Sequence, residues 1–266
     1  MRVALAQMGS GADKGENLEK IRAMTRAAAA AGARLTVFPE GAMVHLTDPD
    51  QPLAPFAEPL GGPFVETLQG LSAEHSMAIL CGVYEPDGEG RAYNTIAALD
   101  QGRLIGSYRK IHLYDAFGHQ ESRRIRPGSG ETLGFELDGL RIGVMTCYDV
   151  RFPELARRLV DEGAQAIVMP SGWVRGLLKE EHWEVLVRAR AIENTCYLLA
   201  ADQVGGIYVG SSMVVDPLGV VRFRGGEGEE LVVGEVDAER VAQVRRSVPS
   251  LQHRRIGLAP AAAPAR

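Results

Sequence analysis

One cysteine occupies a position that suits a nucleophile. Cys147 follows the apolar run 142–146 and precedes a helix that we expect to begin near Pro153. At a strand end that leads into a helix, backbone N–H groups and the helix dipole favour negative charge. A thiol there can attack a carbonyl carbon while N–H groups hold the oxyanion that forms. A free cysteine is also commonly a small buried apolar residue, so position alone leaves both interpretations open.

A catalytic thiol needs a base, and Glu40 is the better candidate. It ends the predicted strand 34–39, and functional groups of α/β folds collect at the carboxyl ends of strands. Cys147 also ends its strand, so the two side chains would meet at one rim of a sheet. The alternative for Glu40 is a helix-capping or solvated loop carboxylate. No feature of the sequence places any of the six histidines beside Cys147: His45, His75, His112, His119, His182 and His253.

Lys110 and Glu121 complete the set of candidate ionisable residues. Lys110 lies in the mixed polar and apolar segment 108–115, after a predicted strand. A lysine held among such neighbours would place a fixed positive charge near a developing oxyanion. The alternatives are an exposed lysine at a strand end and an ordinary loop glutamate.

Two other patterns are weak signals of chemistry. Segment 9–15 resembles a dinucleotide-binding glycine loop, but G-x-G-x-x-G requires glycine where Lys14 stands, and Gly15 is not followed by the Lys-Ser/Thr of a Walker A loop. We interpret it as a connecting loop, and a nucleotide-binding α/β protein is an alternative that rests on this loop alone. The sequence has no C-x-x-C, no H-E-x-x-H and no dense carboxylate cluster, so we expect no metal site.

Alternating strands and helices must position these residues. Apolar spacing predicts helices around 18–28, 63–75, 153–162, 180–195 and 237–246, and strands at 2–7, 34–39, 78–84, 93–99, 104–108, 140–146, 166–170, 197–202, 212–216, 220–223 and 230–236. The runs between 78 and 108 predict an antiparallel meander. Two βαβ-containing halves imply an α/β fold with mixed sheets and helices on their outer faces. Because no linker separates the halves, we predict a single domain over 1–256 and a flexible C-terminal tail over 257–266.

Composition narrows the classes of function. The 266 residues are 45% hydrophobic and 24% charged, which excludes a disordered chain, a collagen and a coiled coil. The net charge of −5 argues against nucleic acid as a partner. No run reaches the roughly 18 apolar residues of a membrane span, and the N-terminus does not resemble a signal peptide. Three cysteines form no disulfide framework, so we expect a cytoplasmic protein.

Four short segments in order resemble motifs of the nitrilase superfamily of carbon–nitrogen hydrolases. They are FPE at 38–40, RKIHL at 109–113, QES at 120–122 and CYDVRFPE at 147–154. Further matches are HWEVL at 182–186, RARAIE at 188–193 and the stretch 249–255. The chain is most similar to the amidase branch that includes ω-amidases and deaminated-glutathione amidases. The resemblance covers nearly the whole chain.

The resemblance implies a fold and a division of roles. The fold would be an α-β-β-α sandwich, paired into a homodimer or a higher homo-oligomer in which sandwiches stack. Cys147 would be the nucleophile, Glu40 the general base and later acid, and Lys110 the oxyanion-stabilising cation. Glu121 would orient Lys110 and the substrate amide, and the backbone N–H of Tyr148 would be the second oxyanion donor. The resemblance implies no metal and no organic cofactor.

The implied activity is hydrolysis of a small, carboxylate-bearing amide to acid and ammonia through a cysteine thioester. A nitrilase that uses the same residues on a nitrile is one alternative. A scaffold or binding protein without catalysis is another, although no core catalytic position is substituted.

The loop 171–183 differs from the related amidases, which usually have a Thr/Gly-rich stretch where this chain has Leu-Leu-Lys-Glu at 177–180. Arg175 is a candidate for binding a substrate carboxylate, with a solvated loop arginine as the alternative. Arg151 is a second candidate, but we favour a structural ion pair with Glu154 or Asp149. Trp173 would either line the substrate pocket or pack the loop.

Overall fold

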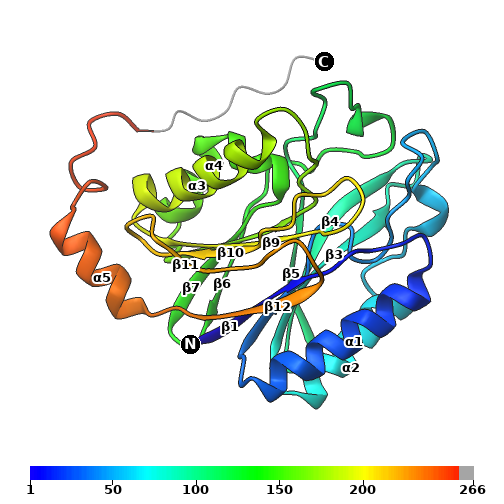
Figure 1. The fold of residues 1–266 in the computed structure, drawn as a ribbon, viewed down its shortest axis with the longest axis horizontal. Helices are drawn as coiled ribbons and strands as arrows, with labels where there is room; N and C mark the ends of the chain where they lie inside the picture. Colours follow the sequence, from blue (N-terminus) through cyan, green and yellow to red (C-terminus); the bar gives the residue numbers. More distant parts are fainter. Residues whose placement is uncertain (258–266) are drawn as a thin grey trace.

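Two six-stranded mixed sheets lie face to face between layers of helices in the computed structural model, which describes residues 1–257 (Figure 1). The first sheet has the order β12 (Glu230–Glu235), β1 (Arg2–Gln7), β2 (Leu35–Val37), β3 (Ala78–Pro86), β4 (Ala92–Asp100) and β5 (Arg103–Arg109). The second has the order β11 (Val221–Arg224), β10 (Met213–Val215), β9 (Tyr197–Asp202), β8 (Ala166–Ser171), β7 (Leu140–Val144) and β6 (Leu133–Leu137).

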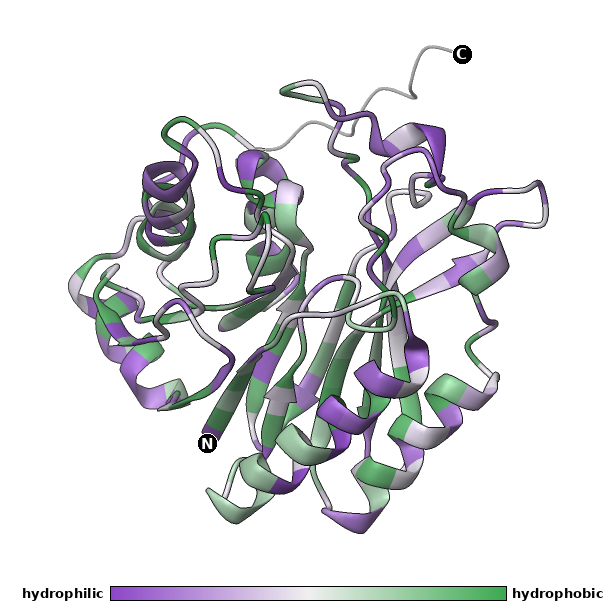
Figure 2. Ribbon diagram, turned by 45° about the vertical axis from the view of Figure 1, so that its right-hand side comes forward, coloured by the Kyte–Doolittle hydropathy of each residue, from purple (hydrophilic) through white to green (hydrophobic). Residues whose placement is uncertain are grey.

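Helices cover the outer face of each sheet. The helices are α1 (Lys14–Ala30), α2 (Pro63–Glu74), α3 (Pro153–Asp161), α4 (Lys179–Asn194) and α5 (Ala238–Ser247). Buried side chains of α1 and α2 pack on the first sheet, and those of α3 and α4 pack on the second. Figure 2 shows largely hydrophobic strands beside helices that carry many hydrophilic residues. The layers therefore follow the α-β-β-α order that the resemblance implies.

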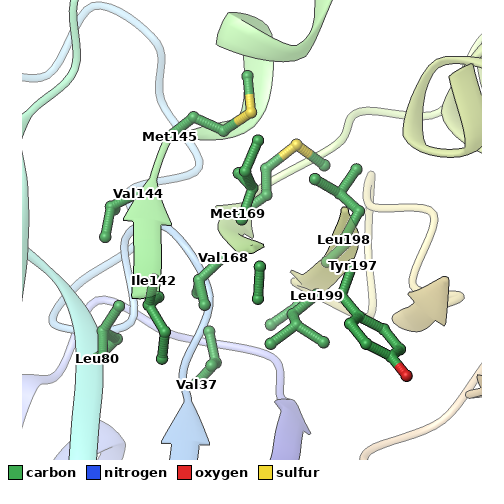
Figure 3. Close-up of a cluster of buried hydrophobic side chains, with 14 of the residues drawn as sticks. Val37, Leu80, Ile142, Val144, Met145, Val168, Met169, Tyr197, Leu198 and Leu199 are labelled. Carbon is green, nitrogen blue, oxygen red and sulfur yellow. The ribbon is translucent and has the colours of Figure 1, made fainter. Parts of the chain in front are cut away.

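The main core fills the space between the two sheets. Val37 and Leu80 of the first sheet pack with Ile142, Val168 and Leu199 of the second, all of them fully buried (Figure 3). Successive residues of a strand point to opposite faces, so a strand between a core and a helix layer is apolar on both sides. This explains the continuous apolar runs that made the central strands easy to predict.

Parallel strands at the centre of each sheet bring functional residues to one end of the sandwich. β1, β2 and β3 are parallel neighbours, as are β7, β8 and β9. The predicted meander is confirmed, because β3, β4 and β5 pair antiparallel in succession. Segment 9–15 leads into α1, and Asp13 caps this helix by accepting hydrogen bonds from the backbone N–H groups of Gly15 and Glu16.

The prediction missed one strand. β6 pairs antiparallel with β7 as the edge of the second sheet. The two are joined by Asp138 and Gly139, which have φ of 48° and 75° and form the kind of two-residue turn that suits a hairpin. Within residues 1–257, no helix is both long and apolar enough to cross a membrane. The predicted tail, apart from Gly257, lies outside the described residues.

Candidate active site

The four predicted catalytic side chains meet at one end of the sandwich, although they come from distant parts of the sequence. Glu40 follows β2, Lys110 follows β5, Glu121 opens the 3-10 turn η2 (Glu121–Arg123), and Cys147 opens the 3-10 turn η3 (Cys147–Arg151). All four line one cavity of about 330 Å³. Both sheets therefore contribute to the cavity.

Lys110 lies between two carboxylates. Its Nζ donates to Glu40 Oε1 at 2.8 Å and to Glu121 Oε2 at 2.8 Å. The lysine is 2% exposed, so these ion pairs are shielded from water. A buried charge needs such partners, and their positions fix where the ammonium points.

Each carboxylate is also held by neutral donors that the sequence prediction missed. The Asn94 amide donates to Glu40 Oε1 at 2.7 Å and to Glu121 Oε1 at 3.1 Å. The backbone N–H of Gly172 donates to Glu40 Oε2 at 2.8 Å, and that of Tyr114 donates to Glu121 Oε2 at 2.6 Å. Strand β4 also carries the polar residues Thr95 and Asp100, so the sequence holds no distinct signal for Asn94.

Glu40 and Lys110 hold each other in their charged forms. Burial raises the pKa of the Glu40 carboxyl, but the charge of Lys110 and hydrogen bonds from Lys110 and Asn94 outweigh it and bring the pKa below its ordinary value. Burial lowers the pKa of Lys110, and the charges of Glu121 and Glu40 raise it well above the usual value. The site therefore contains an ionised carboxylate and a fixed cation.

Cys147 is a thiol in this environment. Burial and the charge of Glu40 raise its pKa well above the ordinary value, against a smaller opposing influence of Lys110. Burial and the facing carboxylate therefore outweigh, in this site, the preference for negative charge that we expect from N–H groups at a strand end. A thiol beside an ionised carboxylate can be deprotonated at the moment of attack.

The backbone of Cys147 is strained, and hydrogen bonds to Asp149 hold the turn that carries it. Its φ is 46°, in the left-handed region that a side chain disfavours. Asp149, fully buried two residues later, accepts hydrogen bonds from the Thr146 N–H at 2.9 Å, the Tyr108 hydroxyl at 2.6 Å and the His112 N–H at 3.1 Å. These contacts tie the turn to the first sheet.

The three predicted substrate-binding side chains are not among the residues that line the cavity. Trp173 is buried and packs against Trp183, with ring centroids 5.6 Å apart. Arg175 is exposed and its Nε donates to the Tyr208 carbonyl at 2.6 Å. Arg151 lies with its guanidinium carbon 5.1 Å from the Trp173 ring centroid.

The ion pair that we favoured for Arg151 is wrong. Asp149 is occupied by Tyr108, Thr146 and His112. Among residues 1–257, Arg151 forms no ion pair with a carboxylate. Its polar side-chain neighbour there is His182, whose Nδ1 lies 3.3 Å from the guanidinium. Across the same residues, no group of three or more His, Cys, Asp or Glu side chains is placed to hold a metal ion.

Sequence relatives agree on the family. Residues 2–246 match the family model described as carbon–nitrogen hydrolase. The chain is 40% identical over 256 residues to the deaminated glutathione amidase of Escherichia coli O157:H7, an alignment that covers 96% of this chain and 97% of that protein. It is 36% identical over 269 residues to the human protein of the same name, covering 95% and 82% of the two chains.

Solved structures show the same fold. Saccharomyces cerevisiae Nit3, a member of branch 10 of the nitrilase superfamily, superimposes with a TM-score of 0.84 at 29% identity, over 96% of this chain and 97% of that one. A variant of the Nesterenkonia AN1 amidase, from the same superfamily, gives 0.82 at 27% identity, over 95% and 96%. Another structure of that amidase carries acrylamide added to its active-site cysteine.

These matches confirm the predicted sandwich fold and the predicted enzyme class, a hydrolase of carbon–nitrogen bonds other than peptide bonds. The motifs that suggested the family also supply the residues that the fold brings to the cavity. This chain belongs to the carbon–nitrogen hydrolase family, within the nitrilase superfamily.

Proposed function

We propose that this amidase hydrolyses a small, carboxylate-bearing amide to the acid and ammonia through a thioester on Cys147. The observation that carries the proposal is the Lys110 ammonium 2.8 Å from both Glu40 and Glu121, in the cavity that Cys147 also lines. A cavity of about 330 Å³ suits a small ligand. The relatives named deaminated glutathione amidase support the substrate class.

Acylation begins with proton transfer to Glu40. The ionised Glu40 takes the proton of the Cys147 thiol as the sulfur attacks the amide carbonyl carbon. The carbonyl oxygen becomes an oxyanion, which Lys110 Nζ and the Tyr148 N–H stabilise. Tyr148 is the second residue of η3, where backbone N–H groups have no partner within the turn. One preorganised donor of this kind is typically worth about 2.7–4 kcal/mol in the transition state.

Glu40 then acts as an acid and again as a base. It returns the proton to the nitrogen as the C–N bond breaks, so ammonia leaves and a thioester remains on Cys147. A water molecule gives a proton to Glu40 and attacks the thioester carbon. As the second oxyanion collapses and the C–S bond breaks, Glu40 returns this proton to the sulfur, which releases the acid and restores the thiol and the ionised carboxylate. Glu121 keeps Lys110 in place through its 2.8 Å hydrogen bond.

An assay of matched substrates tests this proposal. Ammonia release is measured from 2-oxoglutaramate, glutaramate and the nitrile that corresponds to glutaramate. For deaminated glutathione, whose amide nitrogen belongs to a dipeptide, the release of cysteinylglycine is measured instead. We expect turnover of at least one of the amides and much slower turnover of the nitrile. Preferential hydrolysis of the nitrile would favour the nitrilase alternative, and no turnover of any compound would favour a scaffold.

We also propose that the protein works in the cytoplasm and that residues 1–256 act as one domain. All three cysteines are free and buried, which supports a reducing compartment because a thiol enzyme needs its nucleophile reduced. Side chains from both sheets line the active-site cavity, which supports a single functional unit.

A homodimer or larger homo-oligomer is the proposed assembly. Val185 and Ile192 of α4 are 56% and 49% exposed, and Leu218 and Val220 on the adjoining turn are 47% and 49% exposed. Exposed apolar groups that lie together favour an interface between copies of the chain. Light scattering tests the assembly, and a mass of 28.7 kDa at working concentration would contradict it.

A further inference from the structure

A buried lysine without an acidic partner adjoins the active site. Lys179, the first residue of α4, is 4% exposed. Its ammonium lies 3.2 Å from the Tyr114 hydroxyl and 4.3 Å from the Trp173 ring centroid. Among residues 1–257, no carboxylate forms an ion pair with it. Because buried cations are normally paired, a cation held only by rings and one hydroxyl points to a ligand that brings the negative charge.

A second cation lies over the same indole ring. The guanidinium carbon of Arg151 is 5.1 Å from the Trp173 ring centroid, on the ring that Lys179 also contacts. The Nε of Arg151 is buried and, within residues 1–257, has no hydrogen-bond partner. Burial is the main cause that lowers the pKa of Lys179. The charge of Arg151 lowers it further, while Cys147, to a greater extent than Arg151, and Asp202 raise it. An anion between the two cations would relieve their repulsion and satisfy the Arg151 N–H.

Two tyrosines connect this pair of cations to the reacting groups. The Tyr114 hydroxyl contacts Lys179, while its backbone N–H donates to Glu121 and its side chain lies on the wall of the active-site cavity. Tyr148 follows Cys147 directly, and its ring lies 5.1 Å from that of Tyr114. The Tyr148 ring also lies 5.8 Å from the guanidinium carbon of Arg151, so the two tyrosines lie beside both the pair of cations and residues of the active site.

We propose that Lys179 binds the carboxylate of the substrate and selects amides that carry this group at the end opposite the scissile bond. The inference deepens the proposed function and rests on it, adding a residue that determines substrate choice to the reaction already described. Lys179 supplies a point charge and Arg151 a planar donor, so together they hold the two oxygens of one carboxylate. Phe117, which is 66% exposed, lies beside this pair of cations, with its ring centroid 5.2 Å from the Lys179 ammonium.

A pair of substrates that differ only in charge tests Lys179. Glutaramate and pentanamide share the amide and the carbon chain, and only glutaramate has the carboxylate. For Lys179→Met we expect KM for glutaramate to rise about 10- to 100-fold, the loss typical of a charged hydrogen bond, with little change in kcat. The kcat/KM for pentanamide should stay close to that of the wild type. Lys179→Arg should restore most of the affinity for glutaramate, and Glu181→Gln, a charge change on the same turn of α4, should alter neither substrate.

Two results would overturn the inference. An equal loss on both substrates would assign Lys179 a purely structural role, and an unchanged KM for glutaramate would remove it from the substrate site. If the wild type releases ammonia from neither amide, the proposed function fails. The role of Lys179 in binding a carboxylate is then tested by a binding measurement that needs no turnover. Calorimetric binding of glutarate to Cys147→Ala that weakens in the double variant Cys147→Ala/Lys179→Met would still support the site, and equal binding by both would overturn it.

Discussion

The Asn94 amide donates to Glu40 Oε1 at 2.7 Å, on the same oxygen that Lys110 contacts at 2.8 Å. Glu40 therefore faces a cation and a neutral donor from the first sheet, while Gly172 after β8 holds its other oxygen. This arrangement keeps an otherwise costly buried carboxylate ionised and ready to accept the proton of Cys147.

Asn94→Asp should shift the acid limb of the pH profile. The change replaces a donor to Glu40 with a second carboxylate, which raises the pKa of Glu40. Since acylation requires ionised Glu40, the acid limb of kcat/KM should move to higher pH, and activity at neutral pH should fall about tenfold or more. Thr95→Val is the matched control, because Thr95 hydrogen-bonds Glu85 on the same strand pair and does not contact Glu40. An Asn94→Asp profile that overlays the wild type would contradict this role.

Glu40→Gln should reduce the sensitivity of the fold to acid. The pKa of Glu40 is lower in the folded state than its ordinary value of 4.5, so its ionised form stabilises the fold at higher pH. That stabilisation is lost as the pH falls from this value through the lower pKa of the folded state. The free energy of unfolding of Glu40→Gln should therefore decline less over this range than that of the wild type. Parallel decline in urea titrations of the two proteins would refute the assignment.

Cys147→Gly should be more stable than Cys147→Ala. The φ of 46° at this position costs a residue with a side chain roughly 1–2 kcal/mol, and glycine avoids the cost. Urea unfolding of the two variants should differ by about 1 kcal/mol in favour of glycine. Equal stability would show that the turn relaxes when the thiol is removed.

Asp149→Asn should slow catalysis without changing substrate affinity. The amide of the variant would offer one acceptor oxygen where the Asp149 carboxylate accepts from Thr146, Tyr108 and His112, so the turn that carries Cys147 would shift. We expect kcat to fall about 10- to 100-fold with KM little changed, and a loss of about 1–3 kcal/mol in the free energy of unfolding. Tyr108→Phe removes one of these contacts and should have a smaller effect. A rise in KM alone would place Asp149 in substrate binding instead.

Much of the fold could be predicted because a strand that is buried on both faces appears in the sequence as a continuous apolar run. Strands such as β1 and β8 lie between the central core and a helix layer, so the residues between their ends are apolar. The edge strand β6 is partly exposed and interrupted by Gly134 and Glu136, so its apolar signal is weak. Its Asp138–Gly139 turn was the stronger signal and would have revealed the hairpin.

The candidate site was predictable only where a residue type implies its own chemistry. Cys147, Glu40 and Lys110 stand out because a thiol, a carboxylate and an ammonium at strand ends suggest catalysis. Asn94 acts by holding two carboxylates, and Lys179 is unusual only because it is buried without an acid, neither of which a sequence displays. The pKa of Cys147 likewise depends on burial and on a glutamate far away in the sequence, which strand-end reasoning alone does not include.

Ammonia release by Cys147→Ala tests the central claim most directly. The variant and the wild type are compared at equal concentration on the amide that releases ammonia fastest in the substrate assay, with matching circular dichroism as proof of folding. A thioester cannot form without the sulfur, so the account predicts ammonia release at the rate of the solution without enzyme. Turnover by folded Cys147→Ala at a rate comparable to the wild type would contradict it.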